Sequence, residues 1–435
     1  MARLSRTQRL GWGAFGIALA LHLVALSTIV LRVEEKRRGE HTPLPRIFRL
    51  FNDGAHRVGP GADFFALYHA AVMLERDGRI YSGGADGVTP PYYVYRYLPA
   101  FAQTVGRLAR LVSPWTAYLA WIALLEALLV GCMLLTRELF GRGPLVPWLW
   151  ALWLAYTPFW LELIMGQFSF AAGGLVFLAG GLAFMGKGKR ALLPWIAAVS
   201  IKIYPLVLLP LWWRRGLFVL SSLLVALVAL GNVPGFLHLP DTWPTFVGMN
   251  LAPTSVAPAN AGNYGFAFFE QLILLKAFRL RGEYWPLVQR AGTLVALGAA
   301  LALAARRRGL PLLSGIAALM LAHQVTYKDV WEHHYSMVLP MGLFLLRDNL
   351  EHRRFTCLIG AALVALALPT PFVLWDRPGG DPAGAWNLAQ QLAVPGAKAL
   401  PALFLFGTAL WTLQRAPAVA TERGKTSFDA AQAPG

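Results

Sequence analysis

Long apolar segments separated by short polar and basic stretches dominate the chain. A run of about 20 apolar residues is long enough to cross the hydrocarbon core of a bilayer as a helix. The pattern therefore predicts an all-α polytopic membrane protein, a bundle of about 12 transmembrane helices with extracytoplasmic loop helices. The predicted segments are residues 11–31, 114–136, 145–165, 168–185, 191–213, 217–233, 285–305, 310–322, a run ending at residue 346, 355–375 and 400–413.

The basic residues between these segments predict their orientation. Short cytoplasmic loops of membrane proteins carry an excess of Lys and Arg, whereas long loops obey this rule weakly. Arg3, Arg6 and Arg9 place the N-terminus in the cytoplasm. We interpret residues 11–31 as an uncleaved anchor, because they are long enough to span, and not as a signal peptide. The loop at residues 32–113 carries many Arg residues, which would favour a cytoplasmic position for it. Because the rule is weak for long loops, we assign the orientation from the short loops.

This topology places both termini in the cytoplasm. We expect residues 1–415 to form one transmembrane domain and residues 416–435 to form a disordered cytoplasmic tail. The sequence shows no internal repeat. The predicted outer loops are residues 32–113, 234–285, 323–335 and 376–397.

One apolar stretch, residues 191–213, has basic clusters at both ends. A straight span would put one of these clusters outside, and the middle of the stretch holds Lys202 and Pro205. We therefore predict a broken pair of short helices that enters and leaves on the cytoplasmic side, because irregular backbone is tolerated at membrane depth when protein surrounds it.

Composition supports the membrane class and excludes others. Hydrophobic residues make up 57% of the chain and charged residues only 14%. The net charge of +17 could indicate nucleic-acid binding, but the basic residues fall in short clusters between apolar segments, which is the positive-inside pattern. We therefore expect a lipid bilayer as partner and no nucleic acid. The two cysteines, Cys132 and Cys357, lie in apolar segments and give no information on redox compartment.

The predicted topology collects the unusual polar residues on the outer side. Asp63 precedes an apolar stripe at helical spacing, which predicts a helix lying against the bundle with Asp63 in its first turn. Asp is a preferred N-cap residue, and a carboxylate there could also accept a proton from a hydroxyl, so both roles stay open. The other outer candidates are Tyr95, Arg96, Tyr97, Gln167, Lys328, Trp331, His333 and His334.

The two neighbouring histidines predict phosphate binding and no metal site. Adjacent residues on a helix point about 100° apart, and no further ligand is spaced to complete a metal site. Lys328 with His333 or His334 could hydrogen-bond an anionic phosphate while Trp331 packs beside it. The alternative is anchoring of these residues in the headgroup zone. Lys202 is costly within an apolar segment, so it either binds the same phosphate or extends toward the membrane surface.

These residues together resemble a known family. Residues 61–68, 95–100, 166–167, 200–205 and 331–335 resemble, in order and topology, the bacterial GT-C glycosyltransferases of family 87. One departure is Leu98, where the family often has proline. The resemblance implies an inner-membrane enzyme without cofactor that transfers a sugar, mannose being common, from a polyprenyl-phosphate donor to a glycolipid or glycan acceptor on the extracytoplasmic face. It also implies that Asp63 is the catalytic base of an inverting reaction.

Independent chemistry is consistent with this function. A phosphate leaving group needs cationic stabilisation rather than a protein acid, and Arg96, Lys202, Lys328 and His333 or His334 are the available cations or hydrogen-bond donors. The sequence contains no Rossmann-type glycine motif of the kind that would indicate a nucleotide donor. A secondary transporter or lipid flippase is the alternative, although transporters usually show two related halves. A non-catalytic scaffold would leave the clustered polar residues unexplained. Glu126, within residues 114–136, has no predicted role.

Overall fold

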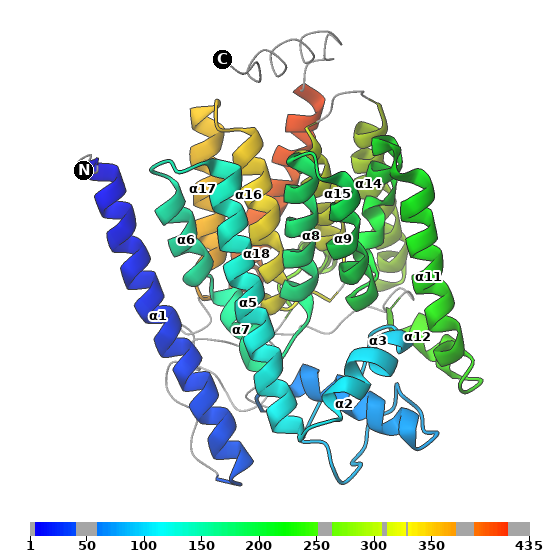
Figure 1. The fold of residues 1–435 in the computed structure, drawn as a ribbon. Coiled ribbons are helices and arrows are strands. Elements are labelled where there is room, and N and C mark those ends of the chain that lie inside the picture. Colours follow the sequence, from blue (N-terminus) through cyan, green and yellow to red (C-terminus); the bar gives the residue numbers. More distant parts are fainter. Residues whose placement is uncertain are drawn as a thin grey trace, which may run out of the picture.

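The computed structural model describes residues 5–40, 59–250, 263–306, 311–327, 329–370 and 387–415. Every regular element in these ranges is helical, which agrees with the predicted all-α class (Figure 1). The longer elements are α1 (Arg6–Arg37), α2 (Ala62–Glu75), α5 (Pro114–Phe140), α6 (Val146–Leu154), α7 (Thr157–Met165), α8 (Ser169–Phe184), α9 (Gly188–Ile201), α11 (Phe218–Phe236), α12 (Thr242–Asn250), α13 (Phe266–Leu272), α14 (Trp285–Arg306), α15 (Leu312–Thr326), α16 (Val338–Asp348), α17 (Arg353–Ala367) and α18 (Leu388–Arg415).

Short elements connect these helices. They are mostly irregular turns of 3₁₀- or π-helix, and several of them surround the cavity described below. They comprise α3 (Pro99–Phe101), η3 (Ala102–Gly106), α4 (Arg107–Ala109), η4 (Tyr204–Leu208), α10 (Leu209–Trp212), η5 (Trp213–Leu217), η6 (Ile273–Ala277), η7 (Gly282–Tyr284) and η8 (Glu332–Met337).

Fewer helices than predicted are long enough to span a membrane. Among the described residues, five helical stretches qualify by length and composition: α1, α5, Tyr204–Phe236, Gly282–Ala304 and α18. The predicted count of about 12 is therefore not confirmed. One reason is that predicted segments are broken. Residues 145–165 form α6 and α7, which are separated just before Pro158, and each half is too short to span.

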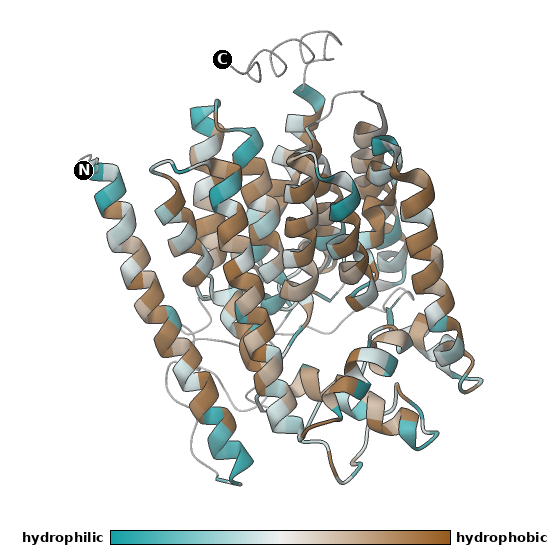
Figure 2. Ribbon diagram, viewed as in Figure 1, coloured by the Kyte–Doolittle hydropathy of each residue, from teal (hydrophilic) through white to brown (hydrophobic). Residues whose placement is uncertain are grey.

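Apolar side chains on the outside identify the lipid-facing surface. In Figure 2 the long helices are brown along most of their length, with teal at several of their ends. On α11 the exposed side chains include Val219, Leu227 and Leu230, at 64–67% exposure, whereas Asn232 turns inward at 3%. Asn232 accepts a hydrogen bond from the backbone N–H of Ala100 at 2.9 Å. This inverted pattern, with polar groups inside and leucines outside, is expected for a helix in lipid.

The predicted break within residues 191–213 is present in the structure. α9 ends at Ile201, and Lys202 has extended backbone angles of φ −137° and ψ 132°. The chain then returns through η4, α10 and η5, and Gly216 adopts φ 73° before α11 begins. A Cβ on Gly188 would lie 3.5 Å from Leu217 Cδ1, so the beginnings of α9 and α11 are neighbours. The basic clusters that flank residues 191–213 therefore lie at the same end of the molecule.

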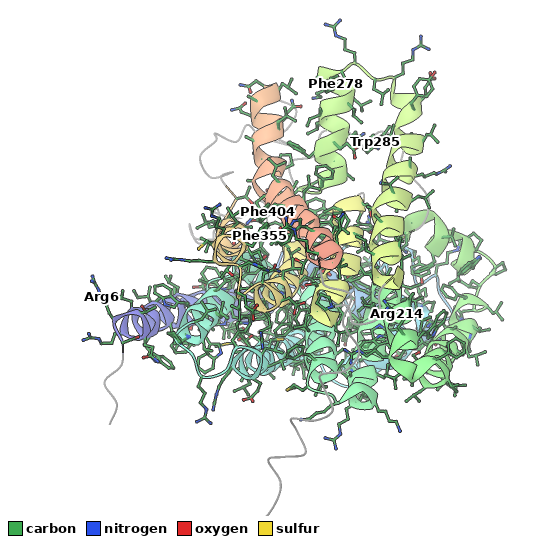
Figure 3. The ribbon with its side chains drawn as sticks, turned by 90° about the horizontal axis from the view of Figure 1, so that it is seen from above. Arg6, Arg214, Phe278, Trp285, Phe355 and Phe404 are labelled. Atoms are coloured by element: carbon green, nitrogen blue, oxygen red, sulfur yellow. The ribbon has the colours of Figure 1, made fainter. Side chains whose placement is uncertain are left out.

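The two ends of the bundle differ. α1 begins and α18 ends at one end, whereas α2 and α3 lie at the opposite end (Figure 1). Seen from above, helices that carry Phe278 and Trp285 project beyond the rest of the bundle (Figure 3), and Phe278 is 74% exposed.

Glu126 has a structural partner. Its carboxylate lies 3.1 Å from Nε2 of His22, which is 3% exposed on α1. The other ring nitrogen of His22 lies 3.2 Å from the carbonyl oxygen of Leu154. The pair links two candidate membrane spans, α1 and α5, because a polar group at membrane depth needs a partner inside the protein.

A second buried pair, between Lys398 and Glu332, attaches α18 to η8. The Lys398 Nζ–Glu332 Oε1 distance is 3.2 Å with both side chains at most 1% exposed, and Nζ also donates to Leu366 O at 2.7 Å. Replacing Lys398 by Met leaves a buried carboxylate unpaired, so we expect a loss of about 3–5 kcal/mol of stability.

Thermal unfolding in detergent measures this effect. The matched control is Arg281→Ala, which removes an exposed ion pair with Glu283 and is expected to change stability little. Equal melting temperatures for Lys398→Met and the wild type would contradict the prediction.

Candidate functional site

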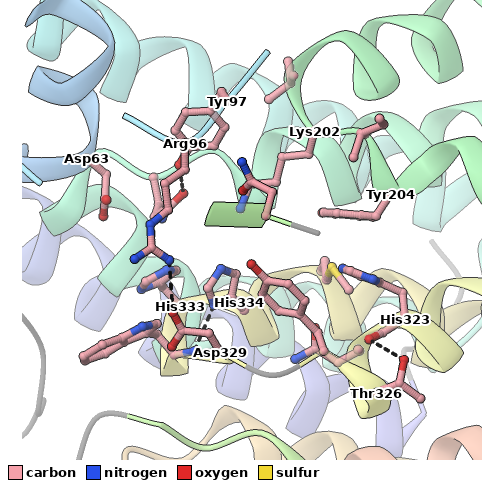
Figure 4. Close-up of a pocket in the computed structure, with 18 of the residues that line it drawn as sticks. Asp63, Arg96, Tyr97, Lys202, Tyr204, His323, Thr326, Asp329, His333 and His334 are labelled. Atoms are coloured by element: carbon pink, nitrogen blue, oxygen red, sulfur yellow. Dashed lines mark hydrogen bonds and ion pairs between the residues drawn. The ribbon is translucent and has the colours of Figure 1, made fainter. Parts of the chain in front are cut away.

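One cavity of about 1130 Å³ brings together most of the residues that the sequence singled out (Figure 4). Its wall is formed by the start of α2, the segment that precedes α3, the break at Lys202, α14, the end of α15 and η8. The predicted residues that line it are Asp63, Arg96, Tyr97, Gln167, Lys202, Trp331, His333 and His334.

Two predicted residues are not part of this lining. Tyr95 is fully buried beside the cavity, and its hydroxyl donates to Leu98 O at 2.7 Å. It stacks on Tyr81 with a ring-centroid distance of 5.7 Å and so supports the loop that carries Arg96 and Tyr97. Lys328 lies outside the described residues.

Two glycines place Asp63 in the cavity. The N-cap of α2 is Gly61, at φ 76°, so Asp63 is the second residue of the helix and not its cap. The Gly61 N–H donates to Ile164 O at 2.8 Å. At the end of α7, Gly166 has φ 65°, and a Cβ there would lie 2.6 Å from Phe64 Cβ. The start of α2 therefore packs directly on the end of α7, and Asp63 in the first turn of α2 lines the cavity.

The environment of Asp63 raises the pKa of its carboxyl to about 7. Burial is the largest cause, because it disfavours the charged form. The positive charges of Lys202 and Arg96 and a hydrogen bond from Gln167 act in the opposite direction. Asp63 belongs to α2, a helix that is not among the candidate membrane spans. A carboxylate with a pKa near 7 is suited to general-base catalysis at neutral pH.

Gln167 and Tyr97 hold this corner of the cavity together. The Tyr97 hydroxyl donates to Gln167 Oε1 at 2.8 Å, and the Phe168 N–H donates to the same oxygen at 2.8 Å. Both donors orient the amide oxygen, so the amide nitrogen is left for Asp63. The predicted outward turn between residues 165 and 168 is thus part of the site.

Lys202 and Arg96 supply the positive charge. Lys202 Nζ donates to Ser169 Oγ at 2.7 Å and lies 5.6 Å from the centre of the Tyr97 ring. Arg96 Nη1 lies 3.1 Å from Asp329 Oδ2, an ion pair that is partly exposed to the cavity. In Figure 4, Arg96 extends from the side of Tyr97 toward Asp329 on the other side. The sequence left open whether Lys202 binds a phosphate or extends toward the membrane surface. In the structure its side chain lines the cavity.

The two histidines lie on the other side of the cavity. His334 Nδ1 accepts the Trp331 N–H at 2.9 Å, so its proton is on Nε2, and the two imidazole rings lie 4.4 Å apart. Burial, and then the nearby Lys202, hold the pKa of His333 well below its usual range. Burial and then His333 do the same for His334. Both rings are neutral hydrogen-bonding groups, not the cations that the sequence allowed.

Comparison with models of protein families decides the class of protein. The model of glycosyltransferase family 87 matches residues 95–326, more than half of the chain. The chain belongs to glycosyltransferase family 87. No curated protein and no solved structure matched it. The protein is therefore a membrane glycosyltransferase, and the resemblance noted in the sequence is confirmed at this level.

The family match covers only part of the cavity of this glycosyltransferase. Arg96, Lys202 and Gln167 lie within the matched residues, whereas Asp63 and η8 lie outside them. The roles of the individual residues stay predictions. Among the described residues, no three His, Cys, Asp or Glu side chains are grouped so that they could hold a metal ion.

Three polar residues in or behind the cavity wall were not among those singled out from the sequence. Glu162 is fully buried behind the cavity wall, where its carboxylate accepts the Phe170 N–H at 2.9 Å and the Ser336 hydroxyl at 2.6 Å. His323 and Gln324 lie at the end of an apolar helix. The available signal was the cost of a polar residue within an apolar segment, which pointed to Lys202 and applies equally to Glu162 within residues 145–165. His323 and Gln324 fell in the predicted outer loop at residues 323–335, where this signal is absent.

Proposed function

We propose that this glycosyltransferase transfers a mannose residue from a polyprenyl-phosphate donor to an acceptor hydroxyl, with inversion at the anomeric carbon. The observation that carries the proposal is the single cavity in which the Asp63 carboxylate lies near two cationic side chains, Lys202 and Arg96. The acceptor is a glycolipid or a glycan.

The proposed reaction uses this arrangement directly. Asp63 accepts the proton of the acceptor hydroxyl while the hydroxyl oxygen forms a bond to the anomeric carbon. The bond between that carbon and the phosphate oxygen breaks, and the phosphate leaves with the bonding electron pair. Arg96 and Lys202 stabilise the negative charge that develops on this oxygen, so the leaving phosphate needs no protein acid.

Apolar side chains in the cavity lining support a lipid-linked donor. They come from η4 and α14 and include Leu206, Val207 and Leu294. Leu294 is 73% exposed on the surface that we assign to lipid. A cavity lined by both charged and apolar side chains suits a molecule with a phosphate and a long hydrocarbon chain.

We place the cavity on the extracytoplasmic side of the bacterial inner membrane, with both termini in the cytoplasm. Support comes from the beginning of α1 and the end of α18, which lie at one end of the bundle and carry Arg6 and Arg415, while α2 lies at the other (Figure 1). A donor that is flipped across the membrane is accessible there, whereas nucleotide sugars are not.

Membrane vesicles of both orientations test the function. They are incubated with a panel of radiolabelled polyprenyl-phosphate sugars and nucleotide sugars. We expect label to reach lipid or glycan only from the polyprenyl-phosphate donor, and only when that donor is on the periplasmic face. Transfer from a nucleotide sugar, or from the cytoplasmic face, would overturn the proposal.

The pKa of Asp63 predicts how the rate depends on pH. The base must be ionised, so kcat/KM should fall tenfold per pH unit below about 7 and level off above it. The donor is a phosphodiester and stays ionised throughout this range. Initial rates in detergent between pH 5.5 and 8.5 measure the profile. A rate that is constant down to pH 5.5 would contradict the assignment.

A further inference from the structure

Buried polar atoms without a partner collect around the cavity. In the described part of the chain, Tyr204 Oη, Gln324 Nε2 and His333 Nε2 are buried and have no hydrogen-bond partner. Gln324 is 3% exposed and His333 is 6% exposed, and all three residues line the cavity. Buried polar groups in proteins are almost always paired. Three such groups on one cavity therefore indicate a ligand that supplies the missing partners.

Two of these groups, those of Gln324 and His333, belong to elements on the other side of the cavity from Asp63 and Lys202, whereas Tyr204 follows Lys202 by two residues. Gln324 is in the last turn of α15, His333 is in η8, and Tyr204 begins η4. In Figure 4, His323 and His333 are on the opposite side from Asp63 and Lys202, and Tyr204 is at one end. Lys202 thus lies on the side of the cavity opposite to His333, while Arg96 extends between the two sides and pairs with Asp329.

Flat aromatic rings accompany the unpaired atoms. The Tyr204 and His323 rings are stacked at 4.5 Å with 16° between their planes, and His323 lies 5.1 Å from the Tyr327 ring. A sugar presents hydroxyl groups at its edge and C–H groups on its faces, so it can bond the polar atoms while it packs on the rings. A phosphate is bound most strongly by cations, and burial lowers the pKa of both His323 and His333, so these two imidazoles are neutral donors and not cations.

We propose that Tyr204, His323, Gln324 and His333, the hydroxyl-binding wall, bind the hexose of the donor, while Arg96 and Lys202 bind its phosphate. This inference rests on the proposed function and adds to it a division of the site. It moves His333 from the phosphate to the sugar. It also makes the wall the part of the enzyme that discriminates between hexoses, because a misplaced hydroxyl leaves a buried group unpaired.

Binding measurements separate the two parts of the site. The purified enzyme in nanodiscs is titrated with polyprenyl-phosphate mannose, polyprenyl-phosphate glucose and the sugar-free polyprenyl phosphate. The ratio of the sugar-free Kd to the sugar-bearing Kd reports the contribution of the hexose alone. We expect the wild type to bind at least one sugar-bearing lipid more tightly than polyprenyl phosphate.

Variants of the wall should lower only that ratio. Tyr204→Phe removes one hydroxyl with little change in shape, and Gln324→Leu removes the amide. Each is expected to reduce the ratio about tenfold, the value of one hydrogen bond, and to leave the Kd of polyprenyl phosphate unchanged. Arg96→Gln should weaken both lipids equally. Tyr284→Phe is the matched control, since Tyr284 is 46% exposed and is not part of the cavity lining.

Three results would overturn the inference: equal affinity of the wild type for sugar-bearing and sugar-free lipid, an unchanged ratio in Tyr204→Phe and Gln324→Leu, or a rise in the polyprenyl phosphate Kd of these variants equal to that of Arg96→Gln. Near-ultraviolet circular dichroism shows whether each variant is folded. Failure of the proposed function gives a different result, which is a wild type that transfers no sugar in the vesicle assay.

Discussion

The Asp63→Asn variant is expected to lose sugar transfer, with kcat reduced by about 10²–10⁴-fold. The amide keeps the shape of the side chain but has no basic oxygen to accept the proton of the acceptor hydroxyl. The carboxylate is not the N-cap of α2, so its replacement should leave the helix intact. Initial rates with radiolabelled polyprenyl-phosphate mannose measure the loss.

Two controls make this result specific. Asp77→Asn changes an Asp that follows α2 and does not line the cavity, and it should retain wild-type rates. Binding of polyprenyl phosphate to Asp63→Asn should be as tight as in the wild type or tighter, because the removed negative charge would repel the phosphate. Retained turnover in Asp63→Asn would refute the assignment of the base.

Replacing Lys202 by Met is expected to reduce kcat by about 10²–10³-fold, the usual effect of removing one group that stabilises developing charge. A second effect follows from electrostatics. Lys202 is the largest factor that lowers the pKa of Asp63, so without it the acidic limb of the pH profile should move to higher pH. Rate measurements between pH 6 and 9 detect both effects.

The matched control for this variant is Lys189→Met, at the start of α9 and outside the cavity lining. It should change neither kcat nor the pH profile. A Lys202→Met enzyme with lower activity but an unmoved acidic limb would mean that Lys202 supports the structure without contributing charge to the site.

The sequence predicted the class of fold because membrane helices follow from the apolar segments alone. It also predicted the break near Lys202, since two basic clusters on one apolar stretch cannot both face the cytoplasm across a straight span. The predicted count of spans is not confirmed, because a segment such as residues 145–165 has enough apolar residues to cross a bilayer whether its backbone is continuous or divided at Tyr156 into α6 and α7.

The site was predicted in part. Lys202 could be selected because a charge within an apolar segment is rare, whereas Asp63 and Arg96 were selected by their place on the predicted outer side and by the resemblance to the family. The ion pair of Arg96 with Asp329 joins residues 233 positions apart in the chain, and no pattern in one sequence gives such a contact. The neutral state of His333 depends on burial and on Lys202, which only the packed structure reveals. Gln324 fell in the predicted outer loop at residues 323–335, where a polar residue is ordinary, and only the structure places its unpaired amide in the cavity.

The broken pair of helices also bears on how a long lipid could reach the site. α9 ends at Ile201, and the chain returns to the end from which it came, so this pair occupies only part of the depth of the bundle. Next to Lys202 the cavity lining includes Ile203 and, on α14, Leu294, which are also exposed on the outside of the molecule. The same side chains therefore contact both the cavity and the surface that we assign to lipid, which is where we expect the hydrocarbon chain of a donor to approach the site.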